Sequence, residues 1–147
     1  EPAETIRRYQ IASPSIIGIR GVQVAYEMIE EAGIEAIEAK AALGTQLMIA
    51  LHDAWLKPLG FELGTPRDPK FRGGHIILKH KDAKQIALAL RKLKNVIPDY
   101  REPTAIRLAI SPLPTSFVEV WDGFLRLKEL VESGDYKSIQ IDGNRVT

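Results

Sequence analysis

The feature that most constrains this chain is one long apolar stripe at helical spacing. Seven residues, separated alternately by three and four positions, form it: Ile34, Ile37, Ala41, Gly44, Met48, Leu51 and Trp55. The 3.6-residue period of an α-helix places them on one face, so we expect a helix of about six turns with one buried side. Gly44 costs such a helix about 1 kcal/mol relative to Ala, and we expect close packing of a neighbouring element to offset this cost. Pro58 and Gly60 should end the helix.

Another helix is expected immediately before this one. Pro14 disfavours a helical conformation at Ser13, so the helix should begin near Ile16. Gly33 is typical of a helix end. Between these limits, four apolar residues repeat at helical spacing: Val22, Ala25, Met28 and Ile29.

The second half of the chain alternates strands and helices. Residues 61–63 and 73–80 are predicted strands, and we expect them to form an antiparallel pair. Residues 96–101 should form an edge segment, because Pro98 removes a backbone donor, and residues 104–110 a further strand.

Two helices accompany these strands. Asp82 is expected to cap one with a buried stripe of Ile86, Leu90 and Leu93. Ser116 and Glu119 have the spacing of a capping box that opens the other. Its expected buried face consists of Phe117, Val120, Phe124, Leu127 and Val131.

This order of elements predicts an α+β domain with helices packed on one face of a short antiparallel or mixed sheet. We expect a leading segment over residues 1–20, a small α+β domain over 16–137 and a polar tail over 138–147. The chain begins with Glu1, and its first residues lack the basic and apolar regions of a signal peptide. It is expected to be either an interior piece of a longer chain or a trimmed one.

The composition excludes several function classes. The chain has 147 residues, and its 20 basic and 19 acidic residues leave a net charge of +1. Because the basic residues are spread evenly, without interleaved aromatic residues, we expect no nucleic-acid partner. No apolar run is long enough to span a membrane. The absence of cysteine excludes disulfides and thiolate metal sites and fits a reducing, cytoplasmic compartment.

The sequence offers no obvious catalytic or metal-binding motif. His52, His75 and His80 lack metal-ligand spacing, and strand alternation puts the last two on opposite faces. A nucleophile elbow and a glycine-rich phosphate loop are both missing. We therefore expect no metal site.

One strand residue stands apart. Alternation in residues 104–110 places Ile106, Leu108 and Ile110 on one face, and Ala105, Arg107 and Ala109 on the other. The apolar face should contact the helices, so Arg107 projects from the opposite face between two small side chains. Its planar guanidinium suits a bidentate hold on a carboxylate or phosphate. A strand arginine paired with a nearby Asp or Glu is the alternative, and the pattern leaves both open.

The region around Arg107 also resembles a known family. Asp99 to Ala109, followed by Ser111-Pro112-Leu113, Ser116-Phe117 and Val120-Trp121, is similar to the C-terminal region of kynureninases. These are class V, fold-type I enzymes that use pyridoxal 5′-phosphate. Arg72-Gly73-Gly74-His75 resembles the family's Arg-Gly-x-(Gln/His) strand, and Arg8-Tyr9 with Ser13-Pro14-Ser15-Ile16 resembles its segment before the first helix of this region. The resemblance covers about residues 5–133, the last third of such an enzyme.

The resemblance implies an activity for the full-length enzyme. It would hydrolyse L-kynurenine, or its 3-hydroxy form, to anthranilate (or 3-hydroxyanthranilate) and L-alanine, with the cofactor as electron sink. The family's arginine that holds the substrate α-carboxylate falls on Arg107. Ser13 falls where relatives carry a small polar residue, often Asn or Thr, that reaches the cofactor phosphate or the substrate ring across a homodimer interface. Pro114 replaces a Tyr common in the family, a departure that bears on substrate preference.

The resemblance also implies what lies elsewhere. In the family, the lysine that binds the cofactor covalently and most phosphate ligands belong to an N-terminal large domain. We therefore expect no catalytic residue, no bound pyridoxal 5′-phosphate and no activity in this chain alone. Two alternatives stay open: another class V enzyme, desulfurase-like or epimerase-like, and a free-standing amino-acid-binding regulatory module in which Arg107 holds an effector carboxylate.

Overall fold

The computed structural model describes residues 3–9 and 12–141. The chain divides into two compact units, Glu1–Ile34 and Glu35–Thr147, and each is described by itself. The first unit contains a 3₁₀ turn, Ile6–Tyr9, and helix α1, Ile16–Ala32. Ser15 caps α1 by accepting a hydrogen bond from the backbone N–H of Gly18 at 3.1 Å. The predicted ends of this helix are confirmed, and none of its residues is buried.

All residues of the long apolar stripe except Trp55 lie in helix α2, Ile34–Leu51, which belongs to the second unit from Glu35 onward. The expected single helix is wrong at its C-terminal end, where the backbone widens into a π-helical turn, His52–Leu56, and then tightens into a 3₁₀ turn, Lys57–Leu59. Gly60 adopts φ 89° and ends the helix where expected.

Four short strands form one sheet in the order β1-β2-β4-β3. They are β1 (Glu62–Leu63), β2 (His75–Lys79), β3 (Asp99–Arg101) and β4 (Ala105–Ala109). All three pairings are antiparallel, which confirms the predicted pairing of the first two strands. The segment expected at an edge, β3, does lie at one.

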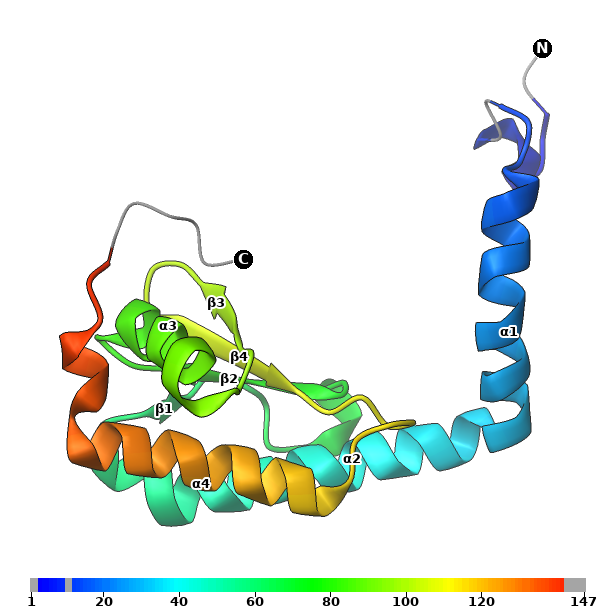
Figure 1. The fold of residues 1–147 in the computed structure, drawn as a ribbon. Coiled ribbons are helices and arrows are strands. Elements are labelled where there is room, and N and C mark those ends of the chain that lie inside the picture. The colour runs from blue at the N-terminus through cyan, green and yellow to red at the C-terminus, as the bar shows by residue number, and fades with distance from the viewer. Residues whose placement is uncertain (1–2, 10–11, 142–147) are drawn as a thin grey trace. The chain divides into compact units, whose positions relative to one another are not determined.

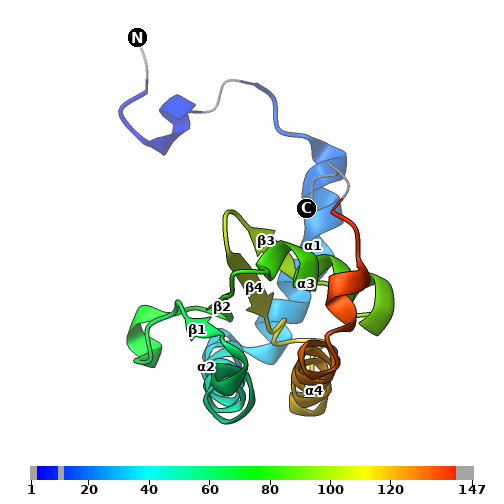
Figure 2. The same ribbon diagram turned by 90° about the vertical axis from the view of Figure 1, so that its left-hand side faces the viewer.

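Helices α2, α3 (Ala83–Lys94) and α4 (Phe117–Ser133) lie on the same side of this sheet (Figures 1 and 2). Their buried side chains form one hydrophobic core with the inward residues Ile76, Leu78 and Ile106 of the sheet. Along this layer α2 and α4 run side by side (Figure 2). The predicted α+β class, with helices on one face of a small sheet, is confirmed.

Three local predictions are wrong. The side chains of Leu93 and Phe117 were expected in the core, but these residues are 50% and 40% exposed, because they lie at the ends of α3 and α4, beyond the buried part of each helix. Asp82 precedes α3 but makes no side-chain capping bond. Its carboxylate accepts instead from the hydroxyl of Tyr136, at 3.1 Å. The capping box of Ser116 and Glu119 is confirmed.

The chain after α4 is ordered around Tyr136, which is buried in the 3₁₀ turn Asp135–Ser138. The predicted polar tail begins at residue 138, and residues 142–147 lie outside the described residues. The predicted extents of the leading segment, the small domain and the tail stay predictions. Within the described residues, no helix has the length and apolar character needed to cross a membrane.

Candidate functional site

The face of the sheet opposite the helices is open and carries the predicted site residue. On β2 the exposure alternates, with Ile76 and Leu78 buried and His75 and Lys79 exposed. Arg107 is the register partner of Ile77, the residue between the two buried ones. Because register partners project from the same face of a sheet, Arg107 lies on the open face, as the alternation predicted.

An acidic partner lies directly across from Arg107. Asp99 on β3 is its register partner, and Asp99 Oδ2 lies 2.5 Å from Arg107 Nη2. The pairing with a nearby acid that the sequence left open is therefore present. The side chain of Arg107 is nevertheless 38% exposed, so the guanidinium is not enclosed in the core.

A second arginine shares the same carboxylate oxygen. Arg101 Nε donates to Asp99 Oδ2 at 2.8 Å, and Arg101 Nη2 lies 2.7 Å from that oxygen. Two guanidinium groups and one carboxylate leave this cluster with one uncompensated positive charge. A cluster of this charge on an open sheet face can bind one further carboxylate or phosphate.

Arg72, in the segment that resembles the family's strand, has a structural role. Its Nε donates to Thr45 Oγ1 at 2.9 Å, its Nη1 donates to the carbonyl of Arg67, and its Nη2 donates to the carbonyl of Ala42 at 3.5 Å. These bonds connect the segment before β2 to helix α2. Arg72 therefore anchors the start of the strand that pairs with β4.

Ser13, the other predicted site residue, lies outside any helix or strand, before α1. It is exposed, and its hydroxyl makes no hydrogen bond to the described residues. Ser13 belongs to the first unit and Arg107 to the second. The predicted role of Ser13 therefore stays a prediction.

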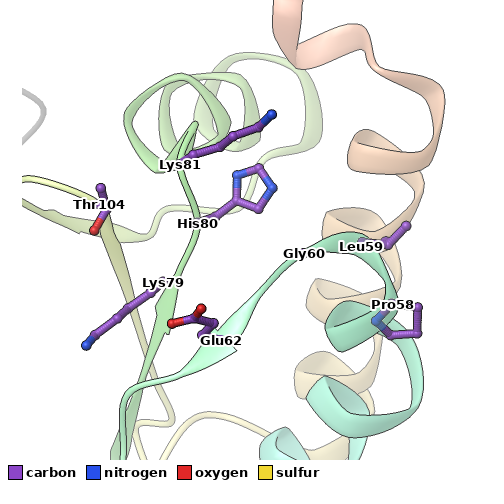
Figure 3. A pocket seen from close by; sticks show the side chains of 8 residues that line it. All are labelled: Pro58, Leu59, Gly60, Glu62, Lys79, His80, Lys81 and Thr104. Atoms are coloured by element: carbon purple, nitrogen blue, oxygen red, sulfur yellow. The ribbon is translucent and has the colours of Figure 1, made fainter.

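A hollow of about 660 Å³ lies at the C-terminal end of β2 (Figure 3). Lys79, His80 and Lys81 line it together with Glu62. The side chains of Lys79 and Lys81 point in opposite directions, so their ammonium groups do not converge on one ligand (Figure 3).

His80 is buried, and its Nδ1 accepts from the backbone N–H of Asp82 at 3.0 Å. Burial lowers the pKa of His80, which favours the neutral ring.

Sequence reasoning missed a polar cluster at the π-helical turn. The buried ring of His52 donates from Nε2 to the carbonyl of Phe61 at 3.1 Å, while its Nδ1 lies 3.0 Å from Asp53 Oδ1. Arg67 binds the Asp53 carboxylate through both terminal nitrogens, at 2.7 and 2.8 Å. The hydrogen bond from Arg67 holds the pKa of Asp53 far below its usual range. The chain gives no sequence signal for this cluster, because adjacent helical residues do not normally face each other.

Among the described residues, no group of three His, Asp or Glu side chains is placed to hold a metal ion.

Comparison with known proteins agrees with the resemblance seen in the sequence. A family model described as the kynureninase C-terminal domain matches residues 37–127. The kynureninase of Bacillus thuringiensis subsp. konkukian is 38% identical over 132 residues, which are 90% of this chain and 31% of that protein. The kynureninase of Geobacillus thermodenitrificans is 38% identical over 136 residues, or 92% of this chain and 32% of that protein. The chain thus spans less than half the length of these relatives.

The fold and the open sheet face together define a small α+β domain that presents a cationic arginine cluster. The chain belongs to the kynureninase family, and its matched region is that family's C-terminal domain.

Proposed function

We propose that this chain is the C-terminal part of a pyridoxal 5′-phosphate-dependent kynureninase and that Arg107 binds the α-carboxylate of the substrate. The substrate would be L-kynurenine or its 3-hydroxy form, hydrolysed to the corresponding anthranilate and L-alanine. The supporting observation is the position of Arg107 on the open sheet face, in a cluster with one uncompensated positive charge.

The role of Arg107 would be orientation. A guanidinium fork that holds the carboxylate fixes the substrate's α-carbon relative to the reacting groups, and such positioning accounts for a large share of enzymatic rate enhancement. Carboxylate binding by Arg107 would draw on Nε and Nη1, which donate no hydrogen bond to the described residues, since Asp99 lies closest to Nη2. The ion pair and substrate binding are therefore compatible.

Four of the lysines give no support for covalent cofactor binding in this chain. Lys79 and Lys81, which line the hollow of Figure 3, point apart, and Lys94 and Lys128 pair with Glu129 and Glu132. We infer that the residues that bind pyridoxal 5′-phosphate covalently lie in other parts of the enzyme. Ser13 would contribute at most a hydroxyl to the phosphate or the substrate ring, from the second subunit of a homodimer.

Substitution of Arg107 in a kynureninase holoenzyme that carries this chain as its C-terminal part tests the proposal. Arg107→Lys keeps the charge but loses the planar fork, so kcat/KM for L-kynurenine should fall about 10- to 100-fold. Arg126→Lys is the matched control, because Arg126 also pairs with an acid, Asp122, but lies on α4. Equal activity of the two variants would refute the role of Arg107. Turnover of L-cysteine in place of L-kynurenine would indicate a desulfurase-like enzyme instead.

The 147-residue chain alone is proposed to have no activity. Incubated with pyridoxal 5′-phosphate and dialysed, it should retain no absorbance from a protein-bound chromophore. Calorimetry with L-alanine and other amino acids should detect no tight binding, because the remaining walls of the site would be absent. Micromolar binding of an amino acid would favour the regulatory-module reading.

Helix α1 is proposed to contact other parts of the enzyme. Its apolar side chains are exposed, with Ile16 at 78%, Ile17 at 87% and Tyr26 at 67%. An exposed apolar surface of this kind marks an interaction site. We therefore expect the chain alone to self-associate with rising concentration in size-exclusion chromatography. A strictly monomeric elution at every concentration would contradict this.

A further inference from the structure

The ion pair of Arg107 and Asp99 is built into the register of the sheet. Asp99 and Arg107 are directly opposite in the β3–β4 pairing, so their side chains share the open face. Arg101 lies two residues further along β3 and therefore projects from that face too. Both arginine side chains contact the same atom of Asp99, Oδ2.

Arg101 and Arg107 contact the Asp99 carboxylate in different ways. Arg101 approaches Asp99 Oδ2 through both Nε and Nη2, at 2.8 and 2.7 Å, which fixes the carboxylate. Arg107 comes closest to the same oxygen with Nη2, at 2.5 Å. Within the described part of the chain, Nε and Nη1 of Arg107 have no hydrogen-bond partner. Because the guanidinium is planar and rigid, holding one nitrogen restricts the direction in which the other two point.

We propose that Asp99 is a positioning residue: fixed by Arg101, it orients the guanidinium of Arg107 so that its free nitrogens face the incoming carboxylate. This inference rests on the proposed role of Arg107. Asp99 itself would not contact the substrate.

A purely structural role fits the exposure of these groups poorly. The side chains of Asp99, Arg107 and Arg101 are 33%, 38% and 54% exposed. Ion pairs as exposed as these contribute only about 0–1 kcal/mol to folding stability. Loss of the Asp99 carboxylate should therefore leave the fold in place while freeing the Arg107 side chain to adopt other rotamers.

Asp99→Asn in the kynureninase holoenzyme that carries this chain tests the inference. Asn is similar in size but lacks the charge, so KM for L-kynurenine should rise about tenfold with a much smaller change in kcat. Glu62→Gln is the matched control: it removes an exposed acid from edge strand β1 that makes no ion pair with the described residues. Its KM should equal that of the parent enzyme.

A double variant separates this inference from the proposed function. If Asp99 acts through Arg107, D99N should add almost nothing to the defect of R107K. Additive defects, or a D99N enzyme with unchanged KM beside an impaired R107K enzyme, would overturn the positioning role while leaving the role of Arg107 intact. An unimpaired R107K enzyme would instead refute the proposed function.

A measurement on the chain itself does not depend on turnover. In ¹⁵N-labelled protein, the guanidinium signals of Arg107 should show slower rotation about the Cζ–N bonds than an exposed arginine without a carboxylate partner. D99N should speed that rotation, whereas E62Q should not. Rotation unaffected by D99N would show that Asp99 does not hold the guanidinium, and would overturn the inference.

Discussion

Gly44 in α2 and Ile110, the residue after β4, are in direct contact. A Cβ atom placed on Gly44 would lie 2.5 Å from Ile110 Cδ1 and 3.2 Å from Ile110 Cγ2. Contacts below about 3 Å are shorter than carbon atoms tolerate, so the absence of a side chain at residue 44 allows the helix to approach the end of the strand. The close packing expected to offset the helix-propensity cost of Gly44 is confirmed.

We therefore predict that Gly44→Ala destabilises the domain in spite of the better helix propensity of Ala. Overpacking a core costs about 1–3 kcal/mol, and the propensity gain returns about 1 kcal/mol, which leaves a net loss of about 1 kcal/mol. Gly123→Ala in α4 is the control, because a Cβ there meets nothing within 4 Å. That variant should gain about 0.5–1 kcal/mol. Urea unfolding of both variants checks the prediction, and a stabilised G44A protein would contradict it.

Much of the fold follows from residue spacing. The apolar stripe of α2, the alternation in β4 and the capping box of Ser116 each predicted the right element, because period and capping chemistry are local properties. Leu93 and Phe117 were assigned to the core wrongly. Spacing identifies the face of a helix that is buried, but the neighbouring elements decide how far along that face the burial extends.

The candidate site was predictable only in part. Alternation placed Arg107 on the open face, but the position of Asp99 opposite it depends on the register of the β3–β4 pairing, which the turn between the strands sets. The cluster of His52, Asp53 and Arg67 depends on the π-helical turn, for which no local pattern exists. The anchoring role of Arg72 likewise depends on a contact 27 residues distant in sequence.

Thr45 provides a test of that anchor. Thr45 is fully buried, and its hydroxyl accepts from Arg72 Nε at 2.9 Å. Thr45→Val keeps the shape but removes the acceptor, so the free energy of unfolding should fall by about 1–3 kcal/mol. In an Arg72→Ala background the same substitution should cost clearly less, because no guanidinium is left without its partner. Equal costs in the two backgrounds, measured by chemical denaturation, would show that the hydrogen bond does not stabilise the fold.

The capping box of α4 gives a prediction about helix stability. The Ser116 side chain accepts from the backbone N–H of Glu119 at 3.2 Å, and the Glu119 carboxylate accepts from the backbone N–H of Ser116 at 2.7 Å. Ser116→Ala should cost about 1 kcal/mol, whereas Ser116→Asp should retain most of the stability. Thermal unfolding followed by circular dichroism measures both. A loss in S116D as large as that in S116A would contradict the capping role.

His80 should make the stability of the domain depend on pH. Burial lowers its folded-state pKa below the ordinary value of 6.5, although the nearby Asp82 carboxylate acts in the opposite direction. The unfolded chain therefore binds the proton more readily, and stability rises with pH across the interval between the two pKa values. The contribution is fully present above about pH 6.5 and is lost as the pH falls toward the folded-state value.

Substitution isolates this contribution from those of the carboxylates. His80→Asn preserves an acceptor for the Asp82 backbone N–H but does not titrate, so the change in unfolding free energy between about pH 7.5 and pH 5.5 should become smaller than in the parent protein. His75→Asn, at an exposed position on the neighbouring strand β2, should leave that change unaltered. Urea titrations at several pH values measure it. The reading of His80 as a buried neutral ring fails if H80N retains the full pH dependence, or if H75N abolishes it.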